Sequence, residues 1–284
     1  MILTDERWQE LLHTRATDPG AIRQAYATRK RRAKLLSDHE TLFLVAADQG
    51  AGEDPLAMAD RRELLERLLV ALANPAVDGV LGTPDIVEEL LLLGALHDKV
   101  VFGSMNPGAD EEIDDRFTGY DAPTLVDCGL DGGRMLLRLV GTDPGTALQA
   151  CADAVTELAA YGLVAMIEPL PCKRSGGRLV PQEDPASLAR AVTVASGLGT
   201  TSAHTWLKLP PTSPAAVLGA TTLPVVVLSG LPSGNPAADL DSWGRPLWHA
   251  VVRGLVVDRT LLFSPGGNVR AAVEAAAKVL EAAK

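Results

Sequence analysis

The strongest constraint on this chain is a repeated alternation of short apolar runs with amphipathic segments. Eight runs have the length and composition of buried β-strands, and the segments between them have helical periodicity. Strands that alternate with helices pair in parallel, and strands this apolar need cover on both faces. We therefore predict a (β/α)8 TIM barrel of the α/β class, with a doubly wound open sheet as the alternative. The predicted strands are residues 41–47, 78–82, 99–104, 134–140, 162–168, 203–209, 223–229 and 253–257.

The chain length fits one such domain. A (β/α)8 barrel needs about 250 residues, and the chain has 284. No boundary interrupts the pattern, so we predict a single domain over residues 1–284, with N-terminal helices in 1–40 and the barrel in 41–284. The N-terminal part predicts two helices, 4–17 and 20–36, and the basic residues from Arg29 to Lys34 favour a solvated helix face.

Composition limits the classes of partner and compartment. With 36 acidic and 26 basic residues the net charge is −10, which disfavours a nucleic-acid partner. Cys128, Cys151 and Cys172 match neither a disulfide framework nor a CxxC site. Neither a signal peptide nor a membrane span is predicted. We expect a cytoplasmic protein without a membrane partner, and its oligomeric state, a homo-oligomer included, is left open.

One predicted strand, within Ser202–Pro211, carries a lysine near its end. Lys208 shares a face with Trp206 and His204, while Leu207 and Leu209 face the other way. If the leucines pack on helices, the amine points into the protein. Burial favours the neutral amine, which is the form that attacks a carbonyl. The pattern thus suggests a Schiff-base lysine, against the alternative of a lysine that extends to solvent.

Other predicted strands also end in ionisable residues. Asp48 follows the first strand, Arg138 lies on the fourth, and Glu168 ends the fifth. In a TIM barrel, catalytic groups lie at the C-terminal ends of the strands. These residues, with Lys208, therefore predict a polar active site. The alternatives are a structural ion pair between Glu168 and Arg138, and a turn cap for Asp48.

The residues at these strand ends resemble those of the class I (Schiff-base) aldolases. The chain is similar to the tagatose-bisphosphate and archaeal-type fructose-bisphosphate aldolases, and more closely resembles an aldolase-like (β/α)8 family associated with inositol-catabolic gene clusters. The similarity runs from about residue 40 to the C-terminus. The matching motifs are Asp48-Gln49-Gly50, Glu168-Pro169, Leu207-Lys208, Ser229-Gly230 and Arg259-Thr260.

The resemblance implies an aldehyde-lyase without metal or other cofactor, acting on a phosphorylated keto-sugar or keto-acid. Lys208 would form the imine and Glu168 would carry protons. Asp48 would position a substrate hydroxyl or maintain the protonation of Lys208. Arg138 matches a lysine of the tagatose branch, and its fork of donors suggests a different substrate.

Several residues are candidates for substrate or phosphate binding. The loops after strands seven and eight of a barrel often hold phosphate, which points to Ser229, Gly230 and Arg259. The resemblance adds Gln49. Lys173 and Arg174, in a predicted loop over 170–185, are candidates for clamping a distal anion, with solvated surface as the alternative. Related aldolases tend to have glycine at the position of Asp258, so we expect its carboxylate to turn away from the pocket.

The remaining alternatives concern His204 and the reaction. His204 is expected to be a hydrogen-bonded core histidine. The histidines lack metal-binding spacings, so no metal site is predicted. The same barrel and lysine also suit a transaldolase or an acyl-transfer enzyme. A non-catalytic barrel that binds sugar phosphates is the third alternative.

Overall fold

The computed structural model describes residues 2–36, 38, 40–48, 60–106, 116–140, 145–176, 178–211, 214–229, 235–264 and 267–283. Within these ranges the strands form one sheet. The strands are β1 (Leu42–Ala47), β2 (Gly79–Gly82), β3 (Val100–Ser104), β4 (Gly132–Val140), β5 (Val164–Ser175), β6 (Arg178–Pro181), β7 (Thr205–Leu209), β8 (Val225–Leu228) and β9 (Val252–Val257).

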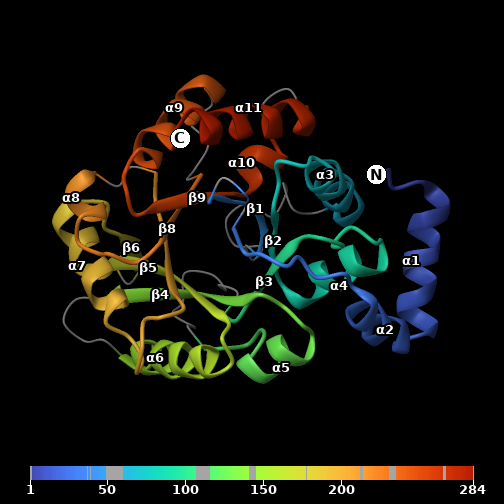
Figure 1. Cartoon of the computed structure of the whole chain (residues 1–284), viewed down its shortest axis with the longest axis horizontal. Helices are drawn as coiled ribbons and strands as arrows, with labels where there is room; N and C mark the ends of the chain where they lie inside the picture. Colours follow the sequence, from blue (N-terminus) through green and yellow to red (C-terminus); the bar gives the residue numbers. More distant parts are fainter. Residues whose placement is uncertain are drawn as a thin grey trace.

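The sheet closes on itself. Parallel neighbours run in the order β4-β3-β2-β1-β9-β8-β7-β5, and β5 also pairs with β4, which completes the ring. Figure 1 shows the helices arranged around this ring. The described strands therefore form the predicted TIM barrel, and the open-sheet alternative is wrong.

Most helices begin at residues that favour a helix start. Asp60, Asp121, Asp184 and Asn268 each accept a backbone N–H of the first turn of α3, α5, α7 and α11, as expected for N-caps. The helices are α1 (Asp5–Thr17), α2 (Gly20–Thr28), α3 (Arg61–Leu72), α4 (Pro84–Leu92), α5 (Ala122–Asp127), α6 (Gly145–Ala160), α7 (Pro185–Ser196), α8 (Ala215–Leu218), α9 (Pro236–Leu247), α10 (Arg259–Leu262) and α11 (Val269–Ala282).

Strand alternation divides the core in two. Phe43 and Val45 of β1 face the helices and belong to the larger cluster, whereas Leu44 and Ala46 face the inside of the barrel. Gly254 of β9 also shows how closely the strands approach, because a Cβ there would lie 1.9 Å from the carbonyl oxygen of Leu42. Side chains from most strands fill the interior, so the barrel is packed and its chemistry is confined to its ends.

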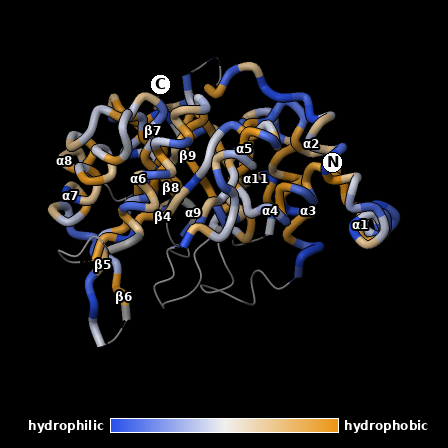
Figure 2. The backbone as a smooth tube through the Cα atoms, turned by 90° about the horizontal axis from the view of Figure 1, so that it is seen from below, coloured by the Kyte–Doolittle hydropathy of each residue, from blue (hydrophilic) through white to orange (hydrophobic). Residues whose placement is uncertain are grey.

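The segment after Glu168 differs from the prediction. Residues 170–185 were expected to form a loop, but β5 continues to Ser175 and turns back as β6 in an antiparallel hairpin. Its register pairs Lys173 with Val180 and Arg174 with Leu179. The hairpin projects from the body of the protein (Figure 2). The segment was predicted as a loop, but residues 172–175 and 178–181 satisfy their backbone groups by pairing with each other.

The basic segment after α2 also differs from the prediction. The helix ends at Thr28 instead of continuing to residue 36, and Arg29 is buried. The Arg29 guanidinium donates to the carbonyls of Lys99 and Gly129 and pairs with Asp131, while Arg32 pairs with Asp78. An extended backbone lets these side chains reach acceptors at the N-terminal ends of the strands. Arg29 and Arg32 therefore anchor the segment to the N-terminal end of the barrel, here called its floor. The predicted helix was wrong, whereas Lys30, Arg31 and Lys34 are exposed as predicted.

Leu35 and Leu36, which follow the basic residues, also pack against the inner cluster of side chains. None of the three cysteines, Cys128, Cys151 and Cys172, is part of a disulfide. Within the described ranges, no helix combines the length and apolar character needed to cross a membrane.

Candidate active site

Four charged side chains form a chain of alternating sign at the C-terminal end of the barrel. Lys208 Nζ lies 2.9 Å from Glu168 Oε2, and the same oxygen accepts a hydrogen bond from Arg134. The other terminal nitrogen of Arg134 lies 3.1 Å from Asp48 Oδ2. The side chains of Asp48, Arg134 and Lys208 are less than one-tenth exposed. Strands β1, β4, β5 and β7 thus bring together groups that are distant in sequence.

Strand geometry explains why these side chains meet. Trp206, two residues before Lys208, belongs to the inner cluster, as does Met166, two residues before Glu168. Lys208 and Glu168 therefore point inward. Their strands are neighbours in the ring, with Met166 opposite Trp206 in the register.

The charges stabilise one another against the penalty of burial. Burial alone would raise the pKa of Glu168, but the positive charges of Lys208 and Arg134 and their hydrogen bonds outweigh it, so the pKa falls from 4.5 to about 2. For Arg134, burial acts to lower the pKa, but Asp48 and Glu168 outweigh it and raise the pKa above its ordinary value. Glu168 is therefore a carboxylate at neutral pH.

Some polar atoms in this region have hydrogen-bonding capacity to spare. Among the described residues, both carboxylate oxygens of Asp48, Nε of Arg134 and Oγ of Ser104 are buried without a hydrogen-bond partner. The ion pair of Asp48 brings it close to Arg134 without hydrogen-bond geometry. Ser104 shares the inner face of β3 with Phe102 and is opposite Arg134 in the register. Buried polar groups are normally satisfied, so these atoms suit a hydroxylated ligand.

The sequence suggested Arg138 as the arginine of the site, but Arg134 is the one that contacts Glu168 and Asp48. Arg138 lies four residues further along β4, is half-buried and is opposite Leu170 in the register. The structural ion pair considered between Arg138 and Glu168 is formed by Arg134 instead. Because positions 134 and 138 share a strand face, alternation alone could not separate them.

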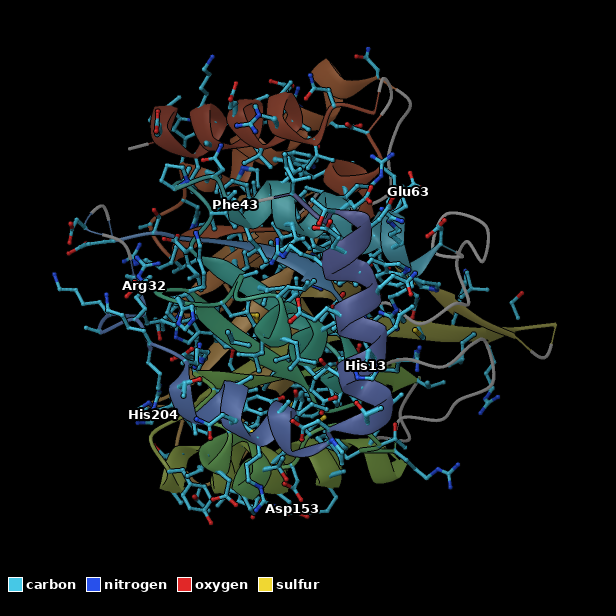
Figure 3. The ribbon with its side chains drawn as sticks, turned by 90° about the vertical axis from the view of Figure 1, so that its right-hand side faces the viewer. His13, Arg32, Phe43, Glu63, Asp153 and His204 are labelled. Carbon is cyan, nitrogen blue, oxygen red and sulfur yellow. The ribbon has the colours of Figure 1, made fainter. Side chains whose placement is uncertain are left out.

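His204 does not belong to the core. It precedes β7, is half-buried, and lies with Arg32 on the side of the molecule away from the β5–β6 hairpin (Figure 3). The prediction of a core histidine was wrong because β7 begins one residue later, at the floor of the barrel.

The end of the barrel formed by β8 and β9 is occupied by a second polar cluster. Ser229 Oγ donates to Asp258 Oδ1 over 2.8 Å, and the backbone N–H and hydroxyl of Thr260 each lie 3.2 Å from the same oxygen. All three residues are buried. The Asp258 carboxylate is therefore turned toward Ser229 and Thr260.

The other binding candidates are less fully described. Lys173 and Arg174 are exposed on the β5–β6 hairpin. Alternation along β5 places Arg174 on the same face as Glu168 and Lys173 on the opposite face. Gln49 and Gly230 lie outside the described residues, and so does the side chain of Arg259.

Sequence reasoning missed Arg134 and Ser104. Arg134 stood at the first position of the predicted fourth strand, where a residue is expected near the floor, and Ser104 ended a strand without a charge to draw attention. Among the described residues, no group of three or more His, Cys, Asp or Glu side chains is arranged to hold a metal ion.

A protein-family comparison decides the family. The model described as Cgl0159-like matches residues 40–277. This chain belongs to the Cgl0159-like family. The crystal structure of Cgl0159 from Corynebacterium glutamicum (Brevibacterium flavum) is 41% identical, covers 99% of each chain and superposes with a TM-score of 0.93. A search of curated proteins found no match to this Cgl0159-like chain.

More distant structures share the fold of this Cgl0159-like protein. A Schiff-base-forming fructose-1,6-bisphosphate aldolase is 16% identical with a TM-score of 0.68, covering 93% of this chain and 100% of the other. An archaeal fructose 1,6-bisphosphate aldolase is 15% identical with a TM-score of 0.69, covering 92% and 99%. At such identities the likeness concerns the TIM-barrel fold alone.

Proposed function

We propose that this protein is a class I aldolase, which makes or cleaves a carbon–carbon bond in a keto-sugar or keto-acid through an imine on Lys208. The observation that carries the proposal is the buried contact between the Lys208 amine and the Glu168 carboxylate, at 2.9 Å. An ion pair in a barrel interior adds little to the stability of the fold, because removing both charges from water costs about as much free energy as their attraction returns. Buried ionisable groups at the catalytic end of a barrel are instead typical of functional sites.

The first step requires Lys208 to lose a proton. Glu168 Oε2 lies 2.9 Å from this amine and can accept the proton. The transfer converts two buried charges into two neutral groups. Arg134 and Asp48 stay paired with each other, so the site keeps no net charge. The low pKa of Glu168 belongs to the state in which Lys208 is charged, and it rises when that charge is lost.

The neutral amine then attacks the substrate ketone to form a carbinolamine. Glu168 returns its proton to the carbinolamine hydroxyl, which leaves as water, and the resulting iminium withdraws electrons from the adjacent carbon–carbon bond. Glu168 next accepts the proton of the hydroxyl that becomes the aldehyde. Bond cleavage leaves an enamine on Lys208, and protonation followed by hydrolysis releases the second product.

Asp48, Arg134 and Ser104 are proposed to orient the substrate. Their buried atoms that lack a hydrogen-bond partner offer acceptors and donors to substrate hydroxyl groups. A distal phosphate or carboxylate would reach the β5–β6 hairpin, where Arg174 lies on the face that continues from Glu168. A cytoplasmic location and a role in inositol catabolism stay predictions.

Imine trapping tests this proposal. The protein is incubated with keto-sugar phosphates and borohydride, and the peptides are analysed by mass spectrometry. We expect a reduced adduct on Lys208 that is absent from Lys208→Ala and retained in Lys278→Ala, a matched change at an exposed residue of α11. Glu168→Gln is expected to slow turnover by roughly 10²-fold or more.

Chelators are expected to leave the activity unchanged. Full activity of Lys208→Ala, or a strict need for a metal, would contradict the lysine mechanism. Ligand binding without any trapped adduct or product would favour the non-catalytic barrel. A requirement for a second acceptor substrate would favour a transaldolase.

A further inference from the structure

The second polar cluster, Ser229, Asp258 and Thr260, lies where barrels commonly bind phosphate. Counted around the closed ring, β8 and β9 are its seventh and eighth strands in chain order. The loops after these strands, with a short helix behind them, frequently hold a substrate phosphate through backbone and hydroxyl donors. Here Ser229 follows β8, Asp258 follows β9, and Thr260 lies in the short helix α10.

The donors of this cluster are already engaged. Asp258 Oδ1 accepts from Ser229 Oγ at 2.8 Å and lies 3.2 Å from both the N–H and the hydroxyl of Thr260. A single carboxylate oxygen therefore receives three donors of the kind that would surround a phosphate oxygen. The cluster is also anchored from behind, because Trp243 Nε1 donates to the carbonyl of Ser229 over 2.7 Å.

Charge adds to this competition for donors. Asp258 is only 8% exposed, so its negative charge is weakly screened by water. A phosphate beside it would meet a like charge in a region of low dielectric constant. It would also have to displace Asp258 from its hydrogen bonds and leave that carboxylate buried without them. A neutral hydroxyl group meets neither penalty and can donate to a carboxylate.

We infer that Asp258 replaces a substrate phosphate, so that the part of the substrate nearest β8 and β9 carries an uncharged hydroxyl group. This inference rests on the proposed aldolase function and narrows its substrate class. Any anionic group of the substrate is then placed away from this cluster, toward the β5–β6 hairpin.

Binding of inorganic phosphate tests the inference without catalysis. Calorimetric titrations would compare the wild type with Asp258→Asn, which removes the charge, and Asp258→Gly, which also opens the space. We expect phosphate affinity to rise by about tenfold or more in Asp258→Gly, because the repulsion and the competition are both lost. Asp121→Asn, the same change at the exposed N-cap of α5, serves as the matched control and should show no gain.

Trapping with a matched pair of ketones tests the substrate class. Borohydride labelling of Lys208 would be measured with dihydroxyacetone and with dihydroxyacetone phosphate. The wild type should favour the neutral ketone, and Asp258→Gly should move the ratio toward the phosphate by about tenfold. Asp258→Asn keeps the side-chain volume and an oxygen that can accept the N–H of Thr260 at the start of α10. The labelling ratio would be measured with this variant if the glycine variant fails to fold.

The two measurements separate the two hypotheses. If neither ketone labels Lys208, the aldolase proposal loses support, while phosphate titration still decides the role of Asp258. The inference would be overturned if neither Asp258 variant bound phosphate more tightly than the wild type. An unchanged ratio of Lys208 labelling by the two ketones would also overturn it.

Discussion

At the scale of single residues, Arg134 supplies the positive charge that lies between the carboxylates of Asp48 and Glu168. It is the only described cation that contacts both Asp48 and Glu168, and it carries more than one terminal nitrogen with which to do so. A lysine in its place would bring one point charge and could not bridge two carboxylates in the same geometry. Arg134 is therefore proposed to position Glu168 and lower its pKa, in addition to orienting the substrate through its Nε.

Replacement of Arg134 by glutamine should change the pH dependence of the reaction. Glu168 would lose one of the two cations that lower its pKa, so its pKa should rise and the acidic limb of the pH–rate profile should move to higher pH. We expect kcat to fall by roughly 10²-fold. The measurement is a pH profile of kcat and kcat/KM.

Arg138→Gln is the matched control for this prediction. It removes the same charge from the same face of β4, but not from Glu168, so the acidic limb should keep its position. An equal shift in both variants would contradict the assignment of Arg134. Sequence periodicity could not make this distinction, since the choice depends on strand stagger and on the reach of a long side chain.

At the scale of elements, the start signals of helices were readable in the sequence and the hairpin was not. Asp60 and Asn268 each cap a helix, and side chains of this kind before a periodic apolar segment are typical of helix starts. The β5–β6 pairing depends on a turn at Gly176, and the polar sequence around it is equally typical of an open loop. Helix α9 was missed because Gly244 and Pro246 interrupt its pattern.

The hairpin gives a prediction about substrate affinity. Arg174→Gln should raise KM for a substrate with a distal phosphate or carboxylate, with a smaller change in kcat, because it removes ground-state binding. Lys173→Gln should have a weaker effect, because strand alternation places it on the opposite face of β5. Steady-state kinetics of the two single variants provide the measurement. A larger effect at Lys173 would contradict this orientation.

At the scale of the whole molecule, the number and order of apolar runs were enough to predict the barrel. Parallel strands with cover on both faces have few ways to close. The contacts of the basic segment with the floor were not predictable, because Asp131 and Asp78 are distant in sequence from Arg29 and Arg32. The sequence does not distinguish these two acidic residues from the others as ion-pair partners. The site was predictable in part, since Lys208, Glu168 and Asp48 were candidates before their contacts were known.

The buried charges should also shape the acid stability of the molecule. The folded-state pKa of Glu168, about 2, is below its ordinary value of 4.5. Ionised Glu168 thus contributes stability above pH 4.5, and this contribution disappears as the pH falls toward 2. The difference in unfolding free energy between the wild type and Glu168→Gln should therefore shrink across this range.

Urea denaturation at pH 7, 5, 4 and 3 measures this difference. Glu157→Gln, an exposed change on α6, provides the control and should show little pH dependence relative to the wild type. A Glu168→Gln difference that stays constant from pH 5 to 3 would contradict the ionised pair.

The contacts beneath the barrel also bear on the order of events during synthesis. Arg31 pairs with Asp131, which follows it by 100 positions, and Arg29 pairs with the same carboxylate. A ribosome completes the basic segment well before it makes these acceptors. The contacts of Arg32 with Asp78 and of Arg29 with Lys99 can form earlier, whereas the contacts with Asp131 must wait until the chain reaches β4. An intermediate of the nascent chain that forms before that point therefore lacks part of the anchoring of this segment.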